Sequence, residues 1–364
     1  MPARTKGSRD PDPGLAEKVA ALRRPQCYGE PVGRVEALET HQSWVFLTAR
    51  HAYKLKKPVR LAFLDFSTLE ARERDCREEV RLNRRLAAET YLGVVALTRG
   101  PDGDLRVGGQ GAVVDWLVKM RRLASDLMLD RVILAGRADA RVIGKIADLL
   151  SAFYGGLAPV VLSPSRYVAR FEREIDEHRR ELARADYGLP RALVRAVTGA
   201  QGDFLRERGA LLRRRVDERR IVEGHGDLRP EHVYVGDPPE VIDCLEFRKA
   251  FRIVDPADEL AFLWMECAGL GAPDVGEGLW RAYADRSGDD APAPLLGFYR
   301  SHRACLRAKL SLWHLKDRDL RDPDKWRSRG ASYLALAGEA VGELAAAGEP
   351  RDQPSSSSTS DPPP

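Results

Sequence analysis

The sequence is poor in cysteine, with five residues in a chain of 364, an odd number that lie far apart. It contains no C-x-x-C pair and no Cys/His cluster with metal-ligand spacing, which argues against a disulfide framework and against a zinc site. The cysteines are therefore predicted to be small buried apolar residues in a reducing compartment. They are Cys27, Cys76, Cys244, Cys267 and Cys305.

Long hydrophobic runs are also missing. The longest run, near residues 260–272, is interrupted by Glu266 and falls short of the roughly 20 residues that a membrane-spanning helix needs. The first 14 residues, MPARTKGSRDPDPG, contain no hydrophobic signal segment. We therefore expect a cytoplasmic protein with no membrane partner.

The chain has no strong excess of charge of one sign. Lys and Arg total 59 and Asp and Glu total 55, which gives a formal net charge of +4, and the two signs are interleaved. This balance is not typical of nucleic-acid binding, so no nucleic-acid partner is expected. No G-x-x-x-x-G-K-[ST] motif occurs, which excludes a P-loop nucleotide site. A hydrophobic fraction of 43% suits a folded protein of one large or two smaller domains.

The most informative stretch is residues 221–247, IVEGHGDLRPEHVYVGDPPEVIDCLEF. It reads as two short strands around a turn, with Asp227 at one end and Asp243 at the other. Such a hairpin can aim both carboxylates at one point. Phosphoryl transfer needs one carboxylate to orient the attacking hydroxyl and another on the metal that neutralises the triphosphate. The structural alternative is an ordinary hairpin whose aspartates make turn hydrogen bonds.

This stretch resembles the catalytic segment of aminoglycoside-phosphotransferase-like enzymes, the small-molecule branch of the protein-kinase fold. Their pattern is H-G-D-x-x-x-x-N, a hairpin, and then I-D. The sequence is similar above all to an uncharacterised bacterial group called "aminoglycoside phosphotransferase family enzyme", from about Val35 to about Trp313. The resemblance implies that Asp227 is the catalytic base and that Asp243 binds the metal, like the aspartate of the kinase D-F-G motif.

One position departs from the family pattern. The second metal ligand of that pattern is an Asn five residues after the catalytic Asp, and His232 stands there instead. Magnesium prefers hard oxygen ligands, whereas imidazole suits softer metals. Four interpretations therefore stay open: His232 acts through a water molecule, Glu231 takes over, manganese is preferred, or the site is impaired.

A lysine-bearing strand is predicted at residues 52–58, after a strand at 44–48. Period-two alternation puts Ala52, Lys54 and Lys56 on one face. The A-x-K spacing of Ala52 and Lys54 mirrors the V-A-I-K strand of kinases, whose lysine holds the nucleotide phosphates. Lys56 is the competing choice, and a solvated basic edge strand is the structural alternative. A glycine-rich loop before Trp44 is missing.

A highly charged helix is predicted from the S-x-x-E capping box at Ser67–Glu70 to about Ala88. Glu79 shares one face of this helix with leucines at the i+3 and i+7 positions. A carboxylate on this inward stripe is predicted to pair with the strand lysine and hold it against the phosphates. Glu78 is the alternative, and a solvent-exposed position is open for both glutamates.

The rest of the chain favours a two-lobed organisation. Further strands are predicted at residues 92–98, 105–107 and 112–120, and the resemblance implies that backbone groups of about Trp116–Val118 bond the adenine edge. Beyond residue 123 helical periodicity dominates, with helices predicted at 142–154, 167–182 and 191–216.

We therefore predict an α+β, bilobal protein-kinase-like fold, with a small antiparallel-sheet lobe, a hinge near Met120 and a mostly helical large lobe. The predicted parts are a flexible arm at residues 1–14, an N-terminal nucleotide-clamping lobe at 15–120, a C-terminal catalytic and substrate lobe at 121–348, and a disordered tail at 349–364.

Two features of the predicted large lobe have both structural and functional interpretations. Asp255 precedes Pro256 in the pattern of a helix N-cap, with substrate contact as the alternative. Arg300, Arg303 and Arg307 fall along one stripe of a later helix. That stripe is either solvated surface or, as the resemblance suggests, the border of the acceptor pocket. In the second case an acceptor with phosphate or carboxylate fits better than a polycationic aminoglycoside.

Together these motifs predict an ATP-dependent phosphotransferase that moves the γ-phosphoryl group to a hydroxyl of a small molecule. Lys54, Glu79 and Asp243 are predicted to bind ATP, Asp243 and His232 to hold Mg²⁺ or Mn²⁺, and Asp227 to act as the base. The alternative is a catalytically impaired nucleotide-binding regulator of the same fold. Protein phosphorylation lacks support because no A-P-E motif follows Asp243. The acceptor, the oligomeric state and a role in antibiotic resistance stay open.

Overall fold

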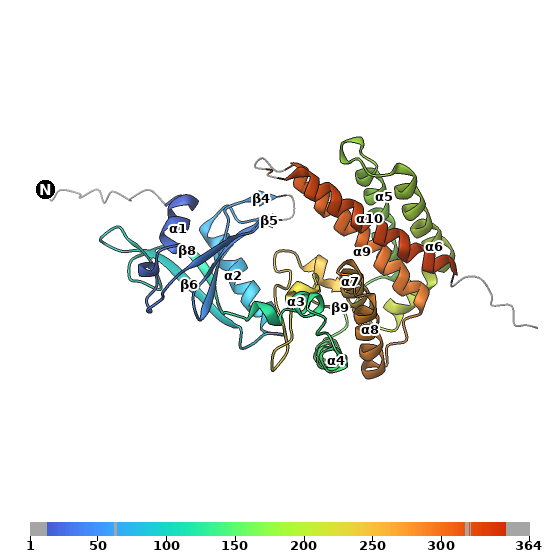
Figure 1. Cartoon of the computed structure of the whole chain (residues 1–364), viewed down its shortest axis with the longest axis horizontal. Helices are drawn as coiled ribbons and strands as arrows, with labels where there is room; N and C mark the ends of the chain where they lie inside the picture. Colours follow the sequence, from blue (N-terminus) through green and yellow to red (C-terminus); the bar gives the residue numbers. More distant parts are fainter. Residues whose placement is uncertain (1–12, 62–63, 317–319, 321, 347–364) are drawn as a thin grey trace, which may run out of the picture. The chain divides into compact units, whose positions relative to one another are not determined.

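The computed structural model of the chain describes residues 13–61, 64–316, 320 and 322–346. These residues form two compact units. Unit 1 contains the described residues of 1–160 and 219–288, and unit 2 contains those of 161–218 and 289–364 (Figure 1). The tail predicted at 349–364 and all but the last two residues of the arm predicted at 1–14 lie outside the described residues. The lobe boundary near Met120 stays a prediction.

A six-stranded antiparallel sheet forms the first part of unit 1, in the order β1-β2-β3-β8-β6-β7. The strands predicted from β-branched and aromatic content are present, with ends shifted by at most two residues. The structure adds β1, which the sequence did not predict. The bounds are β1 Glu36–Glu39, β2 Ser43–Leu47, β3 His51–Lys56, β6 Tyr91–Arg99, β7 Leu105–Val107 and β8 Ala112–Arg121.

Alternation along β3 divides the side chains of this strand between two apolar cores. Tyr53 and Leu55 belong to a core that also includes residues of α1 (Leu15–Leu22). Ala52 belongs to a second core with Cys76 and Val80 of α2 (Leu69–Asn83). Because strand side chains alternate between faces, Lys54 and Lys56 project on the Ala52 side, toward α2. The predicted division of β3 is confirmed.

The start and end of α2 differ from the prediction. The N-cap is Thr68, whose hydroxyl accepts a hydrogen bond from the backbone N–H of Ala71 at 3.1 Å. Ser67, the predicted cap, instead donates to the Asp65 carboxylate. The helix ends at Asn83 rather than near Ala88. The guanidinium of Arg85 donates to the carbonyl of Leu82 at 3.0 Å, which satisfies one of the carbonyls left open at a helix end.

The hairpin region of unit 1 consists of short strands between helices. The predicted hairpin is present as β10 (Val233–Tyr234) and β11 (Glu240–Val241), and β9 (Val222–Glu223) pairs with β12 (Ile253–Val254). The remaining elements of unit 1 are β4 Arg60–Leu61, β5 Leu64–Asp65, α3 Leu129–Leu134, α4 Ala140–Gly155, α7 Pro256–Gly269 and α8 Pro273–Ser287.

Asp255 is the N-cap of α7, because its carboxylate accepts a hydrogen bond from the N–H of Ala257 at 3.0 Å. The structural interpretation of this residue is therefore confirmed. The predicted adenine contact at Trp116–Val118 is wrong. Leu117 and Val118 lie within β8 between β3 and β6, while Trp116 pairs with β6 and its carbonyl accepts from Cys76 Sγ at 3.8 Å, so these backbone groups are already engaged.

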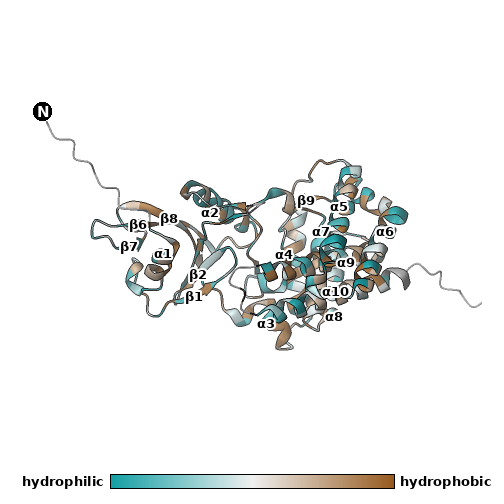
Figure 2. Cartoon of the chain, turned by 90° about the horizontal axis from the view of Figure 1, so that it is seen from above, coloured by the Kyte–Doolittle hydropathy of each residue, from teal (hydrophilic) through white to brown (hydrophobic). Residues whose placement is uncertain are grey.

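Unit 2 is built from the helices α5 Pro164–Leu182, α6 Arg191–Asp217, α9 Ala293–Trp313 and α10 Pro323–Ala346. Figure 2 shows both hydrophilic and hydrophobic residues along α5 and α6. Their apolar residues meet those of α9, for example where the rings of Phe204 and Phe298 stack with centroids 4.5 Å apart. This amphipathic pattern explains why helical periodicity in the sequence located α5 and α6 well.

The arginine stripe of α9 is not solvated surface, contrary to that expectation. Arg300 and Arg303 are buried. Arg300 forms a two-pronged ion pair with Glu343 of α10, at 2.7 and 3.1 Å, and Arg307 donates to the hydroxyl of Tyr333 at 3.1 Å. The stripe therefore joins α9 to α10 within unit 2. The suggestion that it borders the acceptor pocket stays a prediction.

The α+β fold class is confirmed by the antiparallel sheet of unit 1 and the mostly helical remainder of the described residues. The five cysteines are buried and free, as predicted. Across the described part of the chain, no helix is both long and apolar enough to cross a lipid bilayer.

The position of the α2 cap can be tested with two substitutions. Thr68→Ala should lower the free energy of unfolding by about 1 kcal/mol, the usual cost of losing an N-cap side chain. Ser67→Ala is the matched control and should cost less, because its hydroxyl bonds only to Asp65. Urea denaturation followed by circular dichroism measures both values. A larger loss for Ser67→Ala than for Thr68→Ala would contradict the cap assignment.

Candidate active site

Lys54 of β3 lies between two carboxylates that come from distant parts of the sequence. Its Nζ donates to Glu79 Oε1 of α2 at 2.9 Å and to Asp243 Oδ1, just beyond β11, at 2.8 Å. Although burial alone would lower it, the carboxylates of Asp243 and Glu79 hold the pKa of Lys54 well above its usual value. The predicted pairing of the strand lysine with Glu79 is therefore present, and the same lysine contacts Asp243.

Glu78 and Lys56, the two alternatives to Glu79 and Lys54, differ in their contacts. Glu78 points away from Lys54 and forms a two-pronged ion pair with Arg81, at 2.7 Å for both bonds. Lys56, in contrast, donates to the second oxygen of Glu79 at 2.7 Å. The buried Glu79 carboxylate is thus shared by both lysines of β3, so Lys54 and Lys56 do not exclude each other as its partner.

The backbone around Asp243 is in an unusual conformation. Asp243 has a φ of +60°, in the left-handed region that non-glycine residues seldom adopt. Its N–H donates to the hydroxyl of Tyr91 at 3.1 Å, and the N–H of Cys244 donates to Asn83 Oδ1 at 2.9 Å. Asn83 in turn donates to the carbonyl of Glu79 at 2.9 Å. These bonds fix the Asp243 backbone against α2 and β6.

Asp243 combines a charged state with access to a ligand. Burial would raise the pKa of its carboxyl, but the Lys54 ammonium and then His232 hold this pKa well below the ordinary range. Its side chain is nevertheless 46% exposed, whereas the Glu79 side chain is fully buried. Of the two carboxylates on Lys54, Asp243 is the one open to a ligand.

The turn before Asp227 is held by hydrogen bonds to Glu259 of α7. This buried carboxylate accepts hydrogen bonds from the N–H groups of His225, at 2.8 Å, and Gly226. Tyr154 of α4 donates its hydroxyl to Glu259 Oε2 at 2.8 Å. Gly226 has a φ of +91°, and a Cβ there would lie 3.2 Å from the carbonyl oxygen of Phe251, so the H-G-D turn requires glycine.

His232 lies between the two aspartates. Its Nδ1 donates to the carbonyl of Asp227 at 2.9 Å and lies 3.7 Å from Asp227 Oδ2. Its Nε2 lies 3.5 Å from Asp243 Oδ2. Both carboxylates are therefore within 4 Å of one imidazole. The hairpin brings Asp227 and Asp243 to the same place, as the sequence pattern predicts.

Arg229 makes contacts that the sequence did not predict. Its Nε donates to Asp227 Oδ2 at 3.0 Å, its Nη2 to His232 Nε2 at 3.1 Å, and its Nη1 to Glu231. Nδ1 of His232 is engaged by the carbonyl of Asp227, and Arg229 occupies the other ring nitrogen, Nε2. Glu231 reaches Arg229, and no contact with Asp243 is recorded for it among the described residues.

The sequence also offered no indication of Tyr91 and Glu259. Tyr91 accepts a hydrogen bond from the backbone N–H of Asp243, and Glu259 accepts from backbone N–H groups of the H-G-D turn. No spacing rule connects them to Asp243 or to the H-G-D turn, because β6 and α7 lie far from these segments in the sequence. Asn83 was noticeable only because it follows Glu79 by one helical turn. The sequence did contain a signal for Arg229, since it lies two residues after Asp227.

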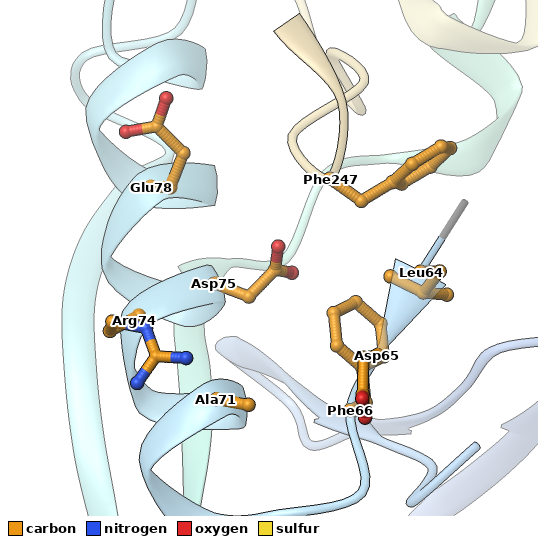
Figure 3. A pocket seen from close by; sticks show the side chains of 8 residues that line it. All are labelled: Leu64, Asp65, Phe66, Ala71, Arg74, Asp75, Glu78 and Phe247. Atoms are coloured by element: carbon orange, nitrogen blue, oxygen red, sulfur yellow. The ribbon is translucent and has the colours of Figure 1, made fainter. Parts of the chain in front are cut away.

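A recess of about 230 Å³ lies beside α2. Figure 3 shows the Asp75 carboxylate pointing from α2 toward Phe66 and Phe247, whereas the Glu78 side chain, also at the edge of this space, points along the helix. Phe247 is the fourth residue after Asp243, so the recess borders the segment that follows the hairpin. Its lining is completed by Leu64, Asp65, Ala71 and Arg74.

Comparisons of sequence find relatives without an assigned activity. No protein-family model matches the chain. The chain is 35% identical over 279 residues to uncharacterized proteins of Mycobacterium tuberculosis and Mycobacterium bovis. The alignments cover 76% of this chain and 54% of each relative, so the chain spans about half the length of the curated relatives it matches.

Comparisons of structure find small-molecule kinases. A choline/ethanolamine kinase family protein from Mesorhizobium loti is 16% identical, with a TM-score of 0.49, over 89% of this chain and 97% of that one. The GDP complex of aminoglycoside 2'-phosphotransferase-IIIa is 14% identical, with a TM-score of 0.47, over 85% and 93%.

A third similar structure is the ternary complex of a thermostable aminoglycoside phosphotransferase APH(4)-Ia mutant with AMP-PNP and hygromycin B. It is 13% identical, with a TM-score of 0.46, over 84% of this chain and 94% of that one. The structural neighbours are thus choline/ethanolamine kinases and aminoglycoside phosphotransferases.

The buried His225 predicts a pH dependence of stability. Burial, and then the neighbouring His232, lower the pKa of His225 from 6.5 to about 4. The unfolded chain therefore binds a proton that the folded chain does not, and this contribution to stability is present above pH 6.5 and lost as the pH falls toward 4. Between pH 7.5 and 5 the loss is roughly 2 kcal/mol.

His225→Asn cannot titrate and serves as the comparison protein. The difference in unfolding free energy between wild type and His225→Asn should shrink from pH 7.5 to pH 5, as measured by urea denaturation. Parallel pH profiles of the two proteins would show that His225 does not titrate on unfolding.

Proposed function

We propose that this protein is an ATP-dependent phosphotransferase that moves the γ-phosphoryl group of ATP to a hydroxyl of a small molecule. The observation that supports this most is the position of Lys54 Nζ, 2.9 Å from Glu79 and 2.8 Å from Asp243. A strand lysine held by a helix glutamate and next to a metal-binding carboxylate is the arrangement that kinases use on the phosphates of ATP.

The residues around Asp243 fit a divalent cation. Lys54 and Lys56 contribute two positive charges, whereas the four carboxylates paired with them contribute four negative ones. Within this group of six charges, a divalent ion would balance the sum. Asp243 offers an ionised, accessible carboxylate, and His232 Nε2 lies 3.5 Å away. When bound, the metal would neutralise charge on the transferring phosphates.

In this proposal the protein contributes mostly position and charge. Lys54, steadied by Glu79, donates to phosphate oxygens of the nucleotide. Asp227 orients the acceptor hydroxyl and takes its proton on a carboxylate oxygen. Glu259 accepts hydrogen bonds from the amides of the H-G-D turn and so fixes the backbone immediately before Asp227. Such preorganisation lowers the barrier because charged groups need not rearrange during transfer.

Other parts of the assignment are proposed more broadly. The adenine edge would bond to backbone beyond β8, near Leu123 and Ala124, since Trp116–Val118 are engaged in the sheet. The acceptor is a small hydroxyl compound of undetermined identity, and no nucleic-acid or membrane partner is proposed. The cytoplasmic location stays a prediction.

Asp227→Asn tests the role of the base. The substitution should lower kcat by at least about 100-fold, the lower end of what general acid–base catalysis contributes, and leave nucleotide affinity nearly unchanged. Glu231→Gln is the control, because it removes a neighbouring carboxylate that also pairs with Arg229. A purified ATP-consumption assay over a panel of hydroxylated metabolites gives kcat, and calorimetry gives the affinity. Equal turnover by Asp227→Asn and wild type would end the base assignment.

His232→Asn tests the metal assignment. An amide oxygen is a harder ligand than imidazole, so the variant should bind nucleotide more tightly with Mg²⁺ while its preference for Mn²⁺ declines. Titration of a non-hydrolysable ATP analogue with each metal, in wild type and variant, measures this ratio of affinities. If the ratio is the same in both proteins, position 232 does not select the metal.

A catalytically impaired nucleotide-binding regulator is the second candidate. The observation in its favour is that Arg229 donates both to Asp227 and to His232, the proposed base and metal residues. Thermal shift with ATP plus Mg²⁺ or Mn²⁺ should show stabilisation in either case. If ATP stabilises the protein but neither wild type nor Arg229→Ala consumes ATP, the regulator is favoured over the enzyme.

A further inference from the structure

Lys56 is a second, buried lysine that contacts α2, and the proposed site gives it no role. Its side chain is 1% exposed, and its Nζ lies 2.7 Å from Glu79 Oε2, 2.5 Å from Glu246 Oε1 and 2.5 Å from Asp75 Oδ2. Although burial alone would lower it, the carboxylates of Glu246, Glu79 and Asp75 hold the pKa of Lys56 well above its usual value. A buried charge is costly unless it is paired in this way.

The partners of Lys56 come from two different segments. Glu79 and Asp75 are neighbours on α2, one helical turn apart. Glu246 lies three residues after Asp243, on the segment that leaves the hairpin. Lys56 therefore connects β3 and α2 to the segment that carries Asp243.

The two lysines of β3 and their carboxylates form a closed set of ion pairs. Lys54 joins Asp243 to one oxygen of Glu79, and Lys56 joins Glu246 to the other oxygen. Asp243 and Glu246 are then linked again through their own backbone. Since Lys54 and Lys56 project from the same face of one strand, they hold two points of the 243–246 segment at a fixed spacing.

Within the described residues, only the beginning of this segment is joined to β6 and α2 by its own backbone groups, and the N–H of Leu245 donates to the carbonyl of His225 at 3.2 Å. Asp243 and Cys244 donate to Tyr91 and Asn83, whereas the carbonyls of Leu245 and Glu246 accept from Arg252 at 2.7 and 3.1 Å. Arg252 ends the short 3-10 helix Lys249–Arg252 before β12, and its Nη2 lies 3.5 Å from Glu78 Oε1, so it links these carbonyls to the outer part of α2. The side chain of Glu246 makes the link to β3, through Lys56.

We propose that Lys56 and Glu246 are positioning residues for Asp243: their ion pair holds the 243–246 segment against β3 and α2, so that the Asp243 carboxylate keeps its place beside Lys54. This inference rests on the proposed function, because it takes Asp243 as the metal ligand. Residues that orient a metal ligand typically change metal affinity or activity by about 10- to 100-fold when they are removed.

Asp75 supplies a matched control. It contacts the same Nζ at the same 2.5 Å distance as Glu246, and removing either residue takes one negative charge from the group. Asp75, however, lies on α2, so its ion pair ties Lys56 to the helix and does not itself hold the 243–246 segment. In Figure 3 its carboxylate points from α2 toward the recess, and Phe247, the residue after Glu246, lies across from it. A change at Lys56 itself would leave three carboxylates without their shared cation, so it is not the variant of choice.

The test uses the full chain as wild type, Glu246→Ala, Glu246→Gln and Asp75→Ala. Mn²⁺ affinity in the presence of a non-hydrolysable ATP analogue is measured by electron paramagnetic resonance. Glu246→Ala should weaken Mn²⁺ binding by about 10-fold or more. Glu246→Gln, which keeps an acceptor for Lys56, should lie between Glu246→Ala and wild type. Asp75→Ala removes the same charge but leaves the link between Lys56 and the segment, so it should weaken Mn²⁺ binding less than Glu246→Ala does.

Hydrogen exchange of the backbone amides of residues 243–247, in protein without metal or nucleotide, gives a second readout. Exchange should be faster in Glu246→Ala and unchanged in Asp75→Ala, because only the first variant releases the segment. Equal effects of Glu246→Ala and Asp75→Ala on both readouts, or no effect of either, would overturn the positioning role alone. Wild-type protein that binds neither Mn²⁺ nor the analogue would overturn the proposed function and this inference together.

Discussion

The ion pairs of Lys54 with Glu79 and Asp243 are the interaction on which the site depends. They join β3, α2 and the segment after β11, which are far apart in the sequence. Glu79 is fully buried, and a buried carboxylate without its partner is strongly destabilising, so the two lysines of β3 hold it in one geometry. Asp243 is the exposed end of this network, and its charge is available to a cation that binds there.

The environment of the second carboxylate follows from a different set of contacts. Asp227 belongs to a turn whose amides are fixed by Glu259, while Arg229 and His232 surround its carboxylate. Asp227 and the accessible, charged Asp243 lie on either side of one imidazole ring. His232 stands where the pattern that the sequence resembles has asparagine, so in the proposed function metal preference and the Arg229 contact are the features to test.

The parts that the sequence predicted are those with a local signal. Alternation along β3 placed Lys54 and Lys56 on one face, and the helical repeat placed Glu79 on the inner face of α2. The H-G-D and I-D motifs marked both aspartates of the hairpin. Features that depend on long-range packing were missed or wrong: the Thr68 cap, the end of α2 at Asn83, the pairing of Trp116–Val118 inside β8, and the burial of the α9 arginines against α10. The sequence could not predict that both lysines share Glu79, because it presents Lys54 and Lys56 as alternative partners of that carboxylate.

The most direct test of the account is a crystal structure of the protein with Mn²⁺ and a non-hydrolysable ATP analogue, in which anomalous scattering locates the metal. The account predicts a manganese peak at bonding distance from the Asp243 carboxylate, phosphate oxygens within hydrogen-bond reach of Lys54 Nζ, and the terminal phosphate facing Asp227. A metal and triphosphate bound elsewhere, with the Lys54–Asp243 ion pair unchanged and no ligand beside it, would contradict it.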